Sequence, residues 1–230
     1  MPSSLTKPSE LSSAPAGAMR LLVATLRLAV AALILAAVLA TVAEAAGRTT
    51  INPFNMFGYF TIQSNLIVMV VLFVGGVLQV RRRADPSWLL QARASAVTYI
   101  AVVGLVYATL LAPLGAAGGV PVPWANTVLH VVTPIFGVLD WLLAPDRRRL
   151  PFRRTIALTL VYPLVWSAVV LIRGATDGWV PYPFLDPSTG YGTVAVYVVL
   201  IAVTIALTGA LVVAATRLST PGPRPMARVP

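Results

Sequence analysis

The sequence predicts an all-α fold, a polytopic membrane bundle of six transmembrane helices with the N and C termini in the cytoplasm. Composition is the first reason: 58% of the 230 residues are hydrophobic and 10% are charged, whereas soluble domains carry about 25% charged residues. The second reason is that the apolar residues form six runs, each close to the ~20 residues that a helix needs to cross a bilayer. The third is the placement of basic residues between these runs.

The six runs define the expected order of elements along the chain. Pro134 and Pro163 lie inside the fourth and fifth runs, where the missing N–H interrupts helical hydrogen bonding. Gly75 and Gly76 in the second run permit close contact between helices. The expected spans are residues 20–45, 58–80, 94–113, 124–144, 153–173 and 190–216.

No internal repeat is visible, so residues 19–217 are predicted to form one membrane domain. Residues 1–18, rich in Ser, Pro and Ala, and residues 218–230 are predicted to be disordered tails. One alternative concerns the first span, because Ala43-Glu-Ala45 resembles a signal-peptidase site. Cleavage there would leave five spans in the same orientation.

Basic residues determine the predicted orientation, because loops rich in Lys and Arg stay in the cytoplasm. With six spans, all of the 17 basic residues except Arg48 and Arg173 fall on the side of the termini. They form short runs between apolar segments and no continuous basic face, which argues against nucleic acid as a partner. Membrane lipids are the expected partners, and a multi-pass protein of the cell membrane is the expected location.

The side-chain inventory limits the possible chemistry. The chain has no cysteine, which excludes disulfides, thiol catalysis and cysteine-ligated metals. One histidine and seven acidic residues make a metal cage an unfavourable interpretation, so neither a metal nor another cofactor is expected.

Two apolar spans carry polar residues at matching depth. The second span begins with the polar segment Tyr59-Phe-Thr-Ile-Gln-Ser-Asn65, and the fourth contains His130. Both spans run inward in the predicted orientation, and at 1.5 Å per residue Thr61 and His130 lie ~5 and ~9 Å below their outer starts. An ionisable residue within a span marks a functional site by default.

Helical spacing places further polar groups beside this pair. Asn65 shares a face with Thr61 at i+4, with Ser64 beside them, and Asn126 shares a face with His130. A threonine hydroxyl becomes a nucleophile when a base takes its proton, and His130 is the candidate base. The candidates for stabilising an oxyanion or orienting the pair are Asn65, Gln63, Asn126 and Ser64. Such a site suits the ester carbonyl of a lipid.

Two non-catalytic interpretations stay open for these residues. Ser, Thr, Asn and His often join membrane helices by hydrogen bonds without any chemistry. A small transporter or lipid-binding protein could also use His130 along a substrate or ion path.

Other polar and aromatic residues carry separate expectations. Glu44 and Arg173 are expected to pair across the bundle, Asp140 to pair with arginines of the fourth loop, and Arg27 to extend to the cytoplasmic face. The fifth loop contains Trp179, Tyr182 and Phe184, which are typical either of an anchor at the membrane interface or of a lid.

The two polar motifs resemble those of a known family. Tyr59-Phe-Thr-Ile-Gln-Ser-Asn65 and Asn126-Thr-Val-Leu-His130 are similar to motifs of the androgen-induced, ADTRP-like family of six-span membrane proteins. The bacterial branch also resembles this chain in Arg173-Gly174 and Pro181-Tyr-Pro-Phe-Leu-Asp186. Eukaryotic members are threonine hydrolases that cleave fatty acid esters of hydroxy fatty acids. The resemblance implies Thr61 as nucleophile and His130 as base, with no cofactor, in a lipid ester hydrolase.

Overall fold

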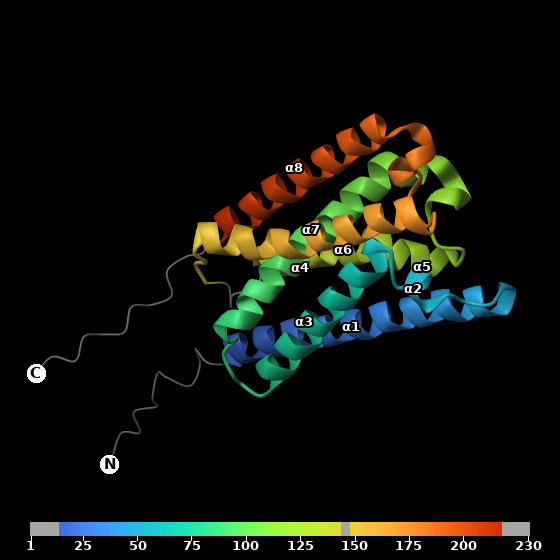
Figure 1. Cartoon of the computed structure of the whole chain (residues 1–230). Coiled ribbons are helices and arrows are strands. Elements are labelled where there is room, and N and C mark those ends of the chain that lie inside the picture. Colours follow the sequence, from blue (N-terminus) through green and yellow to red (C-terminus); the bar gives the residue numbers. More distant parts are fainter. Residues whose placement is uncertain (1–13, 144–147, 218–230) are drawn as a thin grey trace, which may run out of the picture.

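The computed structural model describes residues 14–143 and 148–217, and all regular elements in these residues are helical. Six helical segments are long and apolar enough to cross a membrane, which confirms the predicted all-α bundle (Figure 1). The spans are α1 (Ala14–Arg48), α3 (Phe60–Val80), α4 (Ser87–Val106) continued by η1 (Tyr107–Leu111), α5 (Pro123–Thr127) continued by η3 (Val128–Val132) and α6 (Thr133–Leu143), α7 (Phe152–Thr176) and α8 (Tyr191–Ala215).

The short helical segments lie in the connections. Asn52 caps α2 (Pro53–Met56), and its side chain accepts hydrogen bonds from the backbone N–H groups of Phe54 and Asn55. The connection after η1 is η2 (Ala112–Gly118), and the connection between α7 and α8 contains η4 (Pro183–Leu185) and η5 (Pro187–Thr189). The predicted tail of residues 1–18 overlaps α1, which already begins at Ala14, while residues 1–13 and 218–230 lie outside the described residues.

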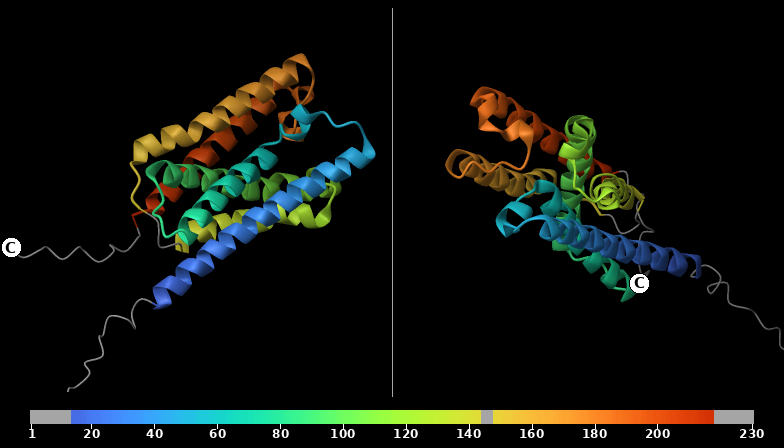
Figure 2. Two further views of the ribbon diagram at one scale, coloured as in Figure 1. Left: turned by 90° about the horizontal axis from the view of Figure 1, so that it is seen from below. Right: turned by 90° about the vertical axis from the view of Figure 1, so that its right-hand side faces the viewer.

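Helix α4 occupies the centre of the bundle and contacts α3, α6, α7 and α8, while α1 packs along α3 at one edge (Figure 2). The start of α1 and the end of α8 lie at the same end of the bundle, which we call the terminal end (Figure 1). The opposite end, where α3 begins, is called the distal end. This arrangement agrees with an even number of spans, and the cytoplasmic location of the termini stays a prediction.

The contact between α1 and α3 depends on small residues, as Gly75 and Gly76 predict. A Cβ added at Gly76 would lie 2.9 Å from Cγ of Leu28 and 3.3 Å from the carbonyl oxygen of Ala24. Only glycine therefore allows the two backbones to approach this closely.

Charged residues are buried at the terminal end and form what we call the ion cluster. Asp140 on α6 accepts hydrogen bonds from Nε of Arg27 at 2.8 Å and from Nη2 of Arg93 at 3.0 Å. Arg93 also bonds Asp85 at 2.8 Å, and Arg27 donates to Oε1 of Gln79 at 3.0 Å. A buried charge is tolerated only with an opposite charge and hydrogen bonds around it. Here these partners come from different helices, so the cluster joins α1, α3, α4 and α6.

The predictions for Arg27 and for the start of the third span were therefore wrong. Arg27 is 1% exposed and does not extend to a membrane face, because Asp140 neutralises its charge inside the bundle. Arg93, which precedes the expected third span at residue 94, belongs to helix α4. Among the described residues Asp140 pairs with Arg27 and Arg93, while Arg147 of the fourth loop lies outside the described residues.

The expected pair of Glu44 and Arg173 does not form in the described part of the chain. Glu44 pairs with Arg48 one turn along the same helix, and Arg173 bonds Asp177 and Asn55. Local partners at i+4 are within reach of each side chain, so a pair across the bundle is unnecessary.

Candidate functional site

Thr61 and His130 line one cavity at the distal end, with a volume of about 200 Å³. Thr61 is the second residue of α3, and His130 lies in the middle of η3. Both side chains are buried, yet no hydrogen bond joins them among the residues that the structure describes. We call this space the His130 cavity. Its polar and aromatic lining includes Thr41, Tyr59, Thr61, His130 and Tyr182, and residues 118–121 also line it.

The imidazole of His130 is oriented by its own helix and by an aromatic ring. Nδ1 lies 3.1 Å from the carbonyl oxygen of Asn126, and the ring stacks on Tyr107 with 4.3 Å between centroids. Because a carbonyl oxygen only accepts, Nδ1 carries the proton of this bond. In the neutral tautomer Nε2 is then the unprotonated nitrogen, as a general base requires.

A local departure from α-helical geometry positions His130. Residues Val128–Val132 form a π-helical turn in which the N–H of Thr133 donates to the carbonyl of Val128. Pro134 explains this turn, since it has no N–H to donate to the carbonyl of His130 and its ring would clash with that carbonyl in a regular helix. Gly104 on α4 leaves room for the proline, because a Cβ there would lie 2.8 Å from Cβ of Pro134. Pro134 thus interrupts its helix as predicted, while α7 continues through Pro163.

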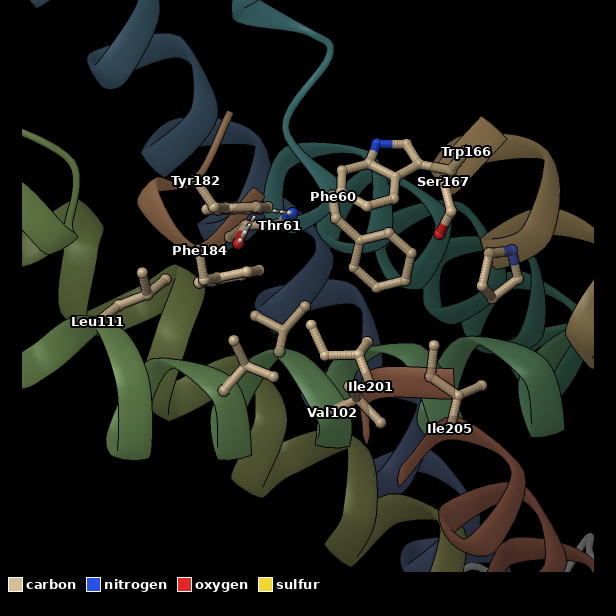
Figure 3. Close-up of a pocket in the computed structure, with 13 residues that line it drawn as sticks. Phe60, Thr61, Val102, Leu111, Trp166, Ser167, Tyr182, Phe184, Ile201 and Ile205 are labelled. Atoms are coloured by element: carbon tan, nitrogen blue, oxygen red, sulfur yellow. Dashed lines mark hydrogen bonds between the residues drawn. The ribbon is translucent and has the colours of Figure 1, made fainter. Parts of the chain in front are cut away.

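Thr61 is held by a tyrosine from the connection between α7 and α8. The first turn of a helix has N–H groups without helical partners, and the N–H of Thr61 donates to the hydroxyl of Tyr182 at 3.2 Å. The same hydroxyl lies 3.3 Å from Oγ1 of Thr61 (Figure 3). Burial raises the pKa of the Tyr182 hydroxyl to about 12, so this group keeps its proton at neutral pH.

The sequence placed Tyr182 in an anchor or a lid and did not connect it with Thr61, which the structure shows it to contact. It packs against Phe184 at 5.2 Å and edge-on against Tyr59 at 5.8 Å. Pro181 and Pro183 limit the backbone on either side. A tyrosine between two prolines in a short connection was the available signal, but its partner lies 121 residues away in the sequence.

The four candidate supporting residues have different surroundings. Asn65 donates from Nδ2 to the carbonyl of Thr61 at 2.9 Å and to the carbonyl of Leu129 at 3.1 Å, so it joins α3 to the turn that carries His130. Its Oδ1 is buried and accepts no hydrogen bond within the described ranges. Asn65 therefore orients the two helices, and its amide does not donate into the cavity.

Asn126 and Gln63 are also engaged away from the hydroxyl of Thr61. Asn126 donates to the hydroxyl of Tyr107 at 2.7 Å and accepts from the N–H of Val120 at 3.1 Å. Gln63 donates to the carbonyl of Phe57 and accepts from the hydroxyl of Tyr162. Neither side chain lines the His130 cavity, so neither amide is placed to donate to an oxyanion at Thr61 in this arrangement.

Ser64 is the remaining candidate, and it is fully buried on α3. Its hydroxyl makes no hydrogen bond in residues 14–143 and 148–217. It does not line the His130 cavity.

A second space, the apolar groove, begins at Thr61 and runs between α3, α4, α7 and α8. Figure 3 shows Thr61 beside Tyr182 and Phe184 at one end, with Val102, Ile201 and Ile205 on the other wall. The groove has a volume of about 50 Å³ and is smaller than the His130 cavity. Thr61, Leu111 and Tyr182 line both spaces, so Thr61 lies between an apolar and a more polar compartment.

Comparison with known proteins finds no family model, no curated protein and no solved structure that matches this chain.

Proposed function

We propose that the chain is an integral membrane hydrolase that cleaves fatty acyl esters, with Thr61 as nucleophile and His130 as general base. The observation that carries this proposal is the position of Thr61, which lines both the apolar groove and the cavity that contains His130. A fatty acyl ester has the same two parts, an apolar chain and a more polar alcohol, joined at the carbon that a nucleophile attacks.

In the first half of the proposed reaction, Oγ1 of Thr61 attacks the acyl carbon while Nε2 of His130 takes the proton of the hydroxyl. The ester C–O bond then breaks, and His130 returns that proton to the departing alcohol. In the second half, water attacks the acyl-threonine, His130 takes a proton from the water, and Thr61 regains a proton as the fatty acid leaves. Each group ends in its starting state, so the cycle needs no co-reactant other than water.

Two features of the free protein bear on this scheme. Thr61 and His130 are not hydrogen-bonded, so the hydroxyl has to turn away from Tyr182, or one water has to carry the proton across the cavity. Catalytic hydrogen bonds often tighten only when substrate binds. Once Thr61 turns away, the protonated hydroxyl of Tyr182 is a donor close to the reacting carbonyl, and we assign it the role of stabilising the oxyanion.

A fluorophosphonate probe tests the proposal directly, since it reacts with activated hydroxyls and replaces fluoride with the enzyme oxygen. We expect mass spectrometry of the purified protein in detergent to find the probe on Thr61, and labelling to disappear in Thr61→Ala and in His130→Ala. Thr41→Ala is the matched control, because Thr41 lines the same cavity but its hydroxyl donates to the carbonyl of Ala37 at 2.8 Å. Labelling of folded Thr61→Ala at the wild-type level would refute the assignment.

A further inference from the structure

The two compartments that meet at Thr61 carry one inference beyond the reaction type, and it rests on the proposed function. We infer that the ester binds with its acyl chain in the apolar groove and its alcohol part in the His130 cavity, and that the chain enters sideways from the membrane between α7 and α8.

The position of His130 determines which part of the ester goes where. His130 lines the larger cavity and does not line the apolar groove. A group that protonates the departing alcohol has to lie within hydrogen-bonding reach of its oxygen. The alcohol part therefore belongs in the His130 cavity, and the acyl chain extends from Thr61 in the other direction.

The residues that line the groove agree with this orientation. Beyond Thr61 and Tyr182 its walls are mainly aliphatic and aromatic, from Val102 on α4, Trp166 on α7 and Ile201 and Ile205 on α8 (Figure 3). The larger cavity, by contrast, presents the polar side chains of Thr41 and His130.

The groove adjoins a second space that includes an exposed apolar residue of α7. A neighbouring space shares Pro163, Trp166, Ile201 and Ile205 with it and reaches Leu164, which is 58% exposed. Leu164 lies on α7 in the middle of an apolar span. An acyl chain that leaves the bilayer by this route exchanges one apolar surrounding for another, so its entry does not require passage through water.

The test fills the groove and compares two esters with the same leaving group, p-nitrophenyl butyrate and p-nitrophenyl palmitate. We expect Ile201→Trp to lower kcat/KM for palmitate by about tenfold or more and to leave butyrate within about twofold, because pocket shape discriminates by size. Leu200→Trp is the matched control, since Leu200 precedes Ile201 on α8 but is 56% exposed, and it should change neither rate. Ile205→Phe replaces Ile201→Trp if the larger residue prevents folding.

The outcomes separate this inference from the proposed function. Equal losses on both esters, or no loss on palmitate, would overturn the assignment of the acyl chain to the groove while Thr61-dependent hydrolysis remains. A selective loss of palmitate hydrolysis in Thr41→Trp, which fills the other cavity, would show the reverse orientation. Absence of any Thr61-dependent hydrolysis in wild-type protein would instead refute the proposed function itself.

Discussion

The two buried polar clusters of this bundle differ in how completely their groups are paired. In the ion cluster, the carboxylate of Asp140 accepts from Arg27 and Arg93 at 2.8 and 3.0 Å. At the distal end, neutral groups meet at 3.1 to 3.3 Å around a cavity, and Oδ1 of Asn65 accepts no bond among the described residues.

This difference is the one expected between a structural cluster and the proposed binding site. The ion cluster has mutual pairs that join four helices, and removal of one partner would leave a buried charge unpaired. The distal cluster, formed by Thr61, Tyr182, His130 and Asn126, surrounds the His130 cavity. It contains the protonated hydroxyl of Tyr182 and an imidazole whose Nδ1 is held by the carbonyl of Asn126. A site that must bind and release a ligand needs groups of this second kind, and the following predictions test whether the two roles are separate.

The largest effect is expected at Thr61. Replacing Thr61 with Ala removes the proposed nucleophile and should lower kcat for ester hydrolysis by about 10³-fold or more. Thr61→Ser keeps a hydroxyl at the same place and should retain measurable activity. Both variants should unfold at temperatures near that of the wild type, as measured by circular dichroism in detergent. Equal activity in Thr61→Ala and Thr61→Ser would contradict a nucleophilic role.

Asp140→Ala should act in the opposite way, on stability first. It leaves Arg27 and Arg93 buried without their shared carboxylate, and breaking a buried pair costs about 3–5 kcal/mol. Thermal unfolding in detergent measures this loss. Glu44→Ala is the control, because the Glu44–Arg48 pair is exposed and such helix pairs contribute about 0.3–0.5 kcal/mol. A similar unfolding temperature for both variants would mean that the ion cluster does not hold the helices together.

Tyr182→Phe is expected to have an intermediate effect that is specific to catalysis. Removing one oxyanion donor costs about 2.7–4 kcal/mol in the transition state, so kcat should fall by about 10²-fold or more while KM changes little. Tyr59→Phe is the matched control, because Tyr59 lines the same cavity and packs edge-on against Tyr182. If KM rises and kcat is unchanged, Tyr182 binds substrate without stabilising the transition state.

The same comparison explains which features were predictable from the sequence. The hydropathy of a segment depends only on its own residues. The six spans and the polar faces around Thr61 and His130 could therefore be predicted from local sequence patterns. The partners of buried charges could not be predicted in this way, because Arg27 and Asp140 are separated by 113 residues in the sequence. An isolated arginine near a helix end was therefore expected to reach the membrane face, and its burial depends on a carboxylate from another helix.

The candidate site was predictable to a similar degree. Matching depth indicated that Thr61 and His130 lie near each other, and both line one cavity. Depth says nothing about rotation of the helices, so it did not indicate that Asn126 and Gln63 bond elsewhere. Tyr182 was missed for the same reason as the ion pairs, since it lies on the distant connection between α7 and α8 and contacts Thr61 at the start of α3 (Figure 3).

The smallest effect is expected for the exposed pair of Arg173 and Asp177, which contrasts with the buried pairs of the ion cluster. The N–H of Trp179 and the guanidinium of Arg173 lower the pKa of Asp177 below its usual 3.8. A carboxyl with a lowered pKa stabilises the fold above its unfolded pKa and loses this effect as the pH falls through the folded pKa. Asp177→Asn should therefore slightly lower the unfolding temperature at pH 7 and make no difference once the wild-type carboxyl is protonated in strong acid. Solvent screens this pair, so the shift should be far smaller than that of Asp140→Ala. A large shift at pH 7 would indicate that the connection carrying Tyr182 depends on this pair, and Asp177→Asn would then also lower ester hydrolysis.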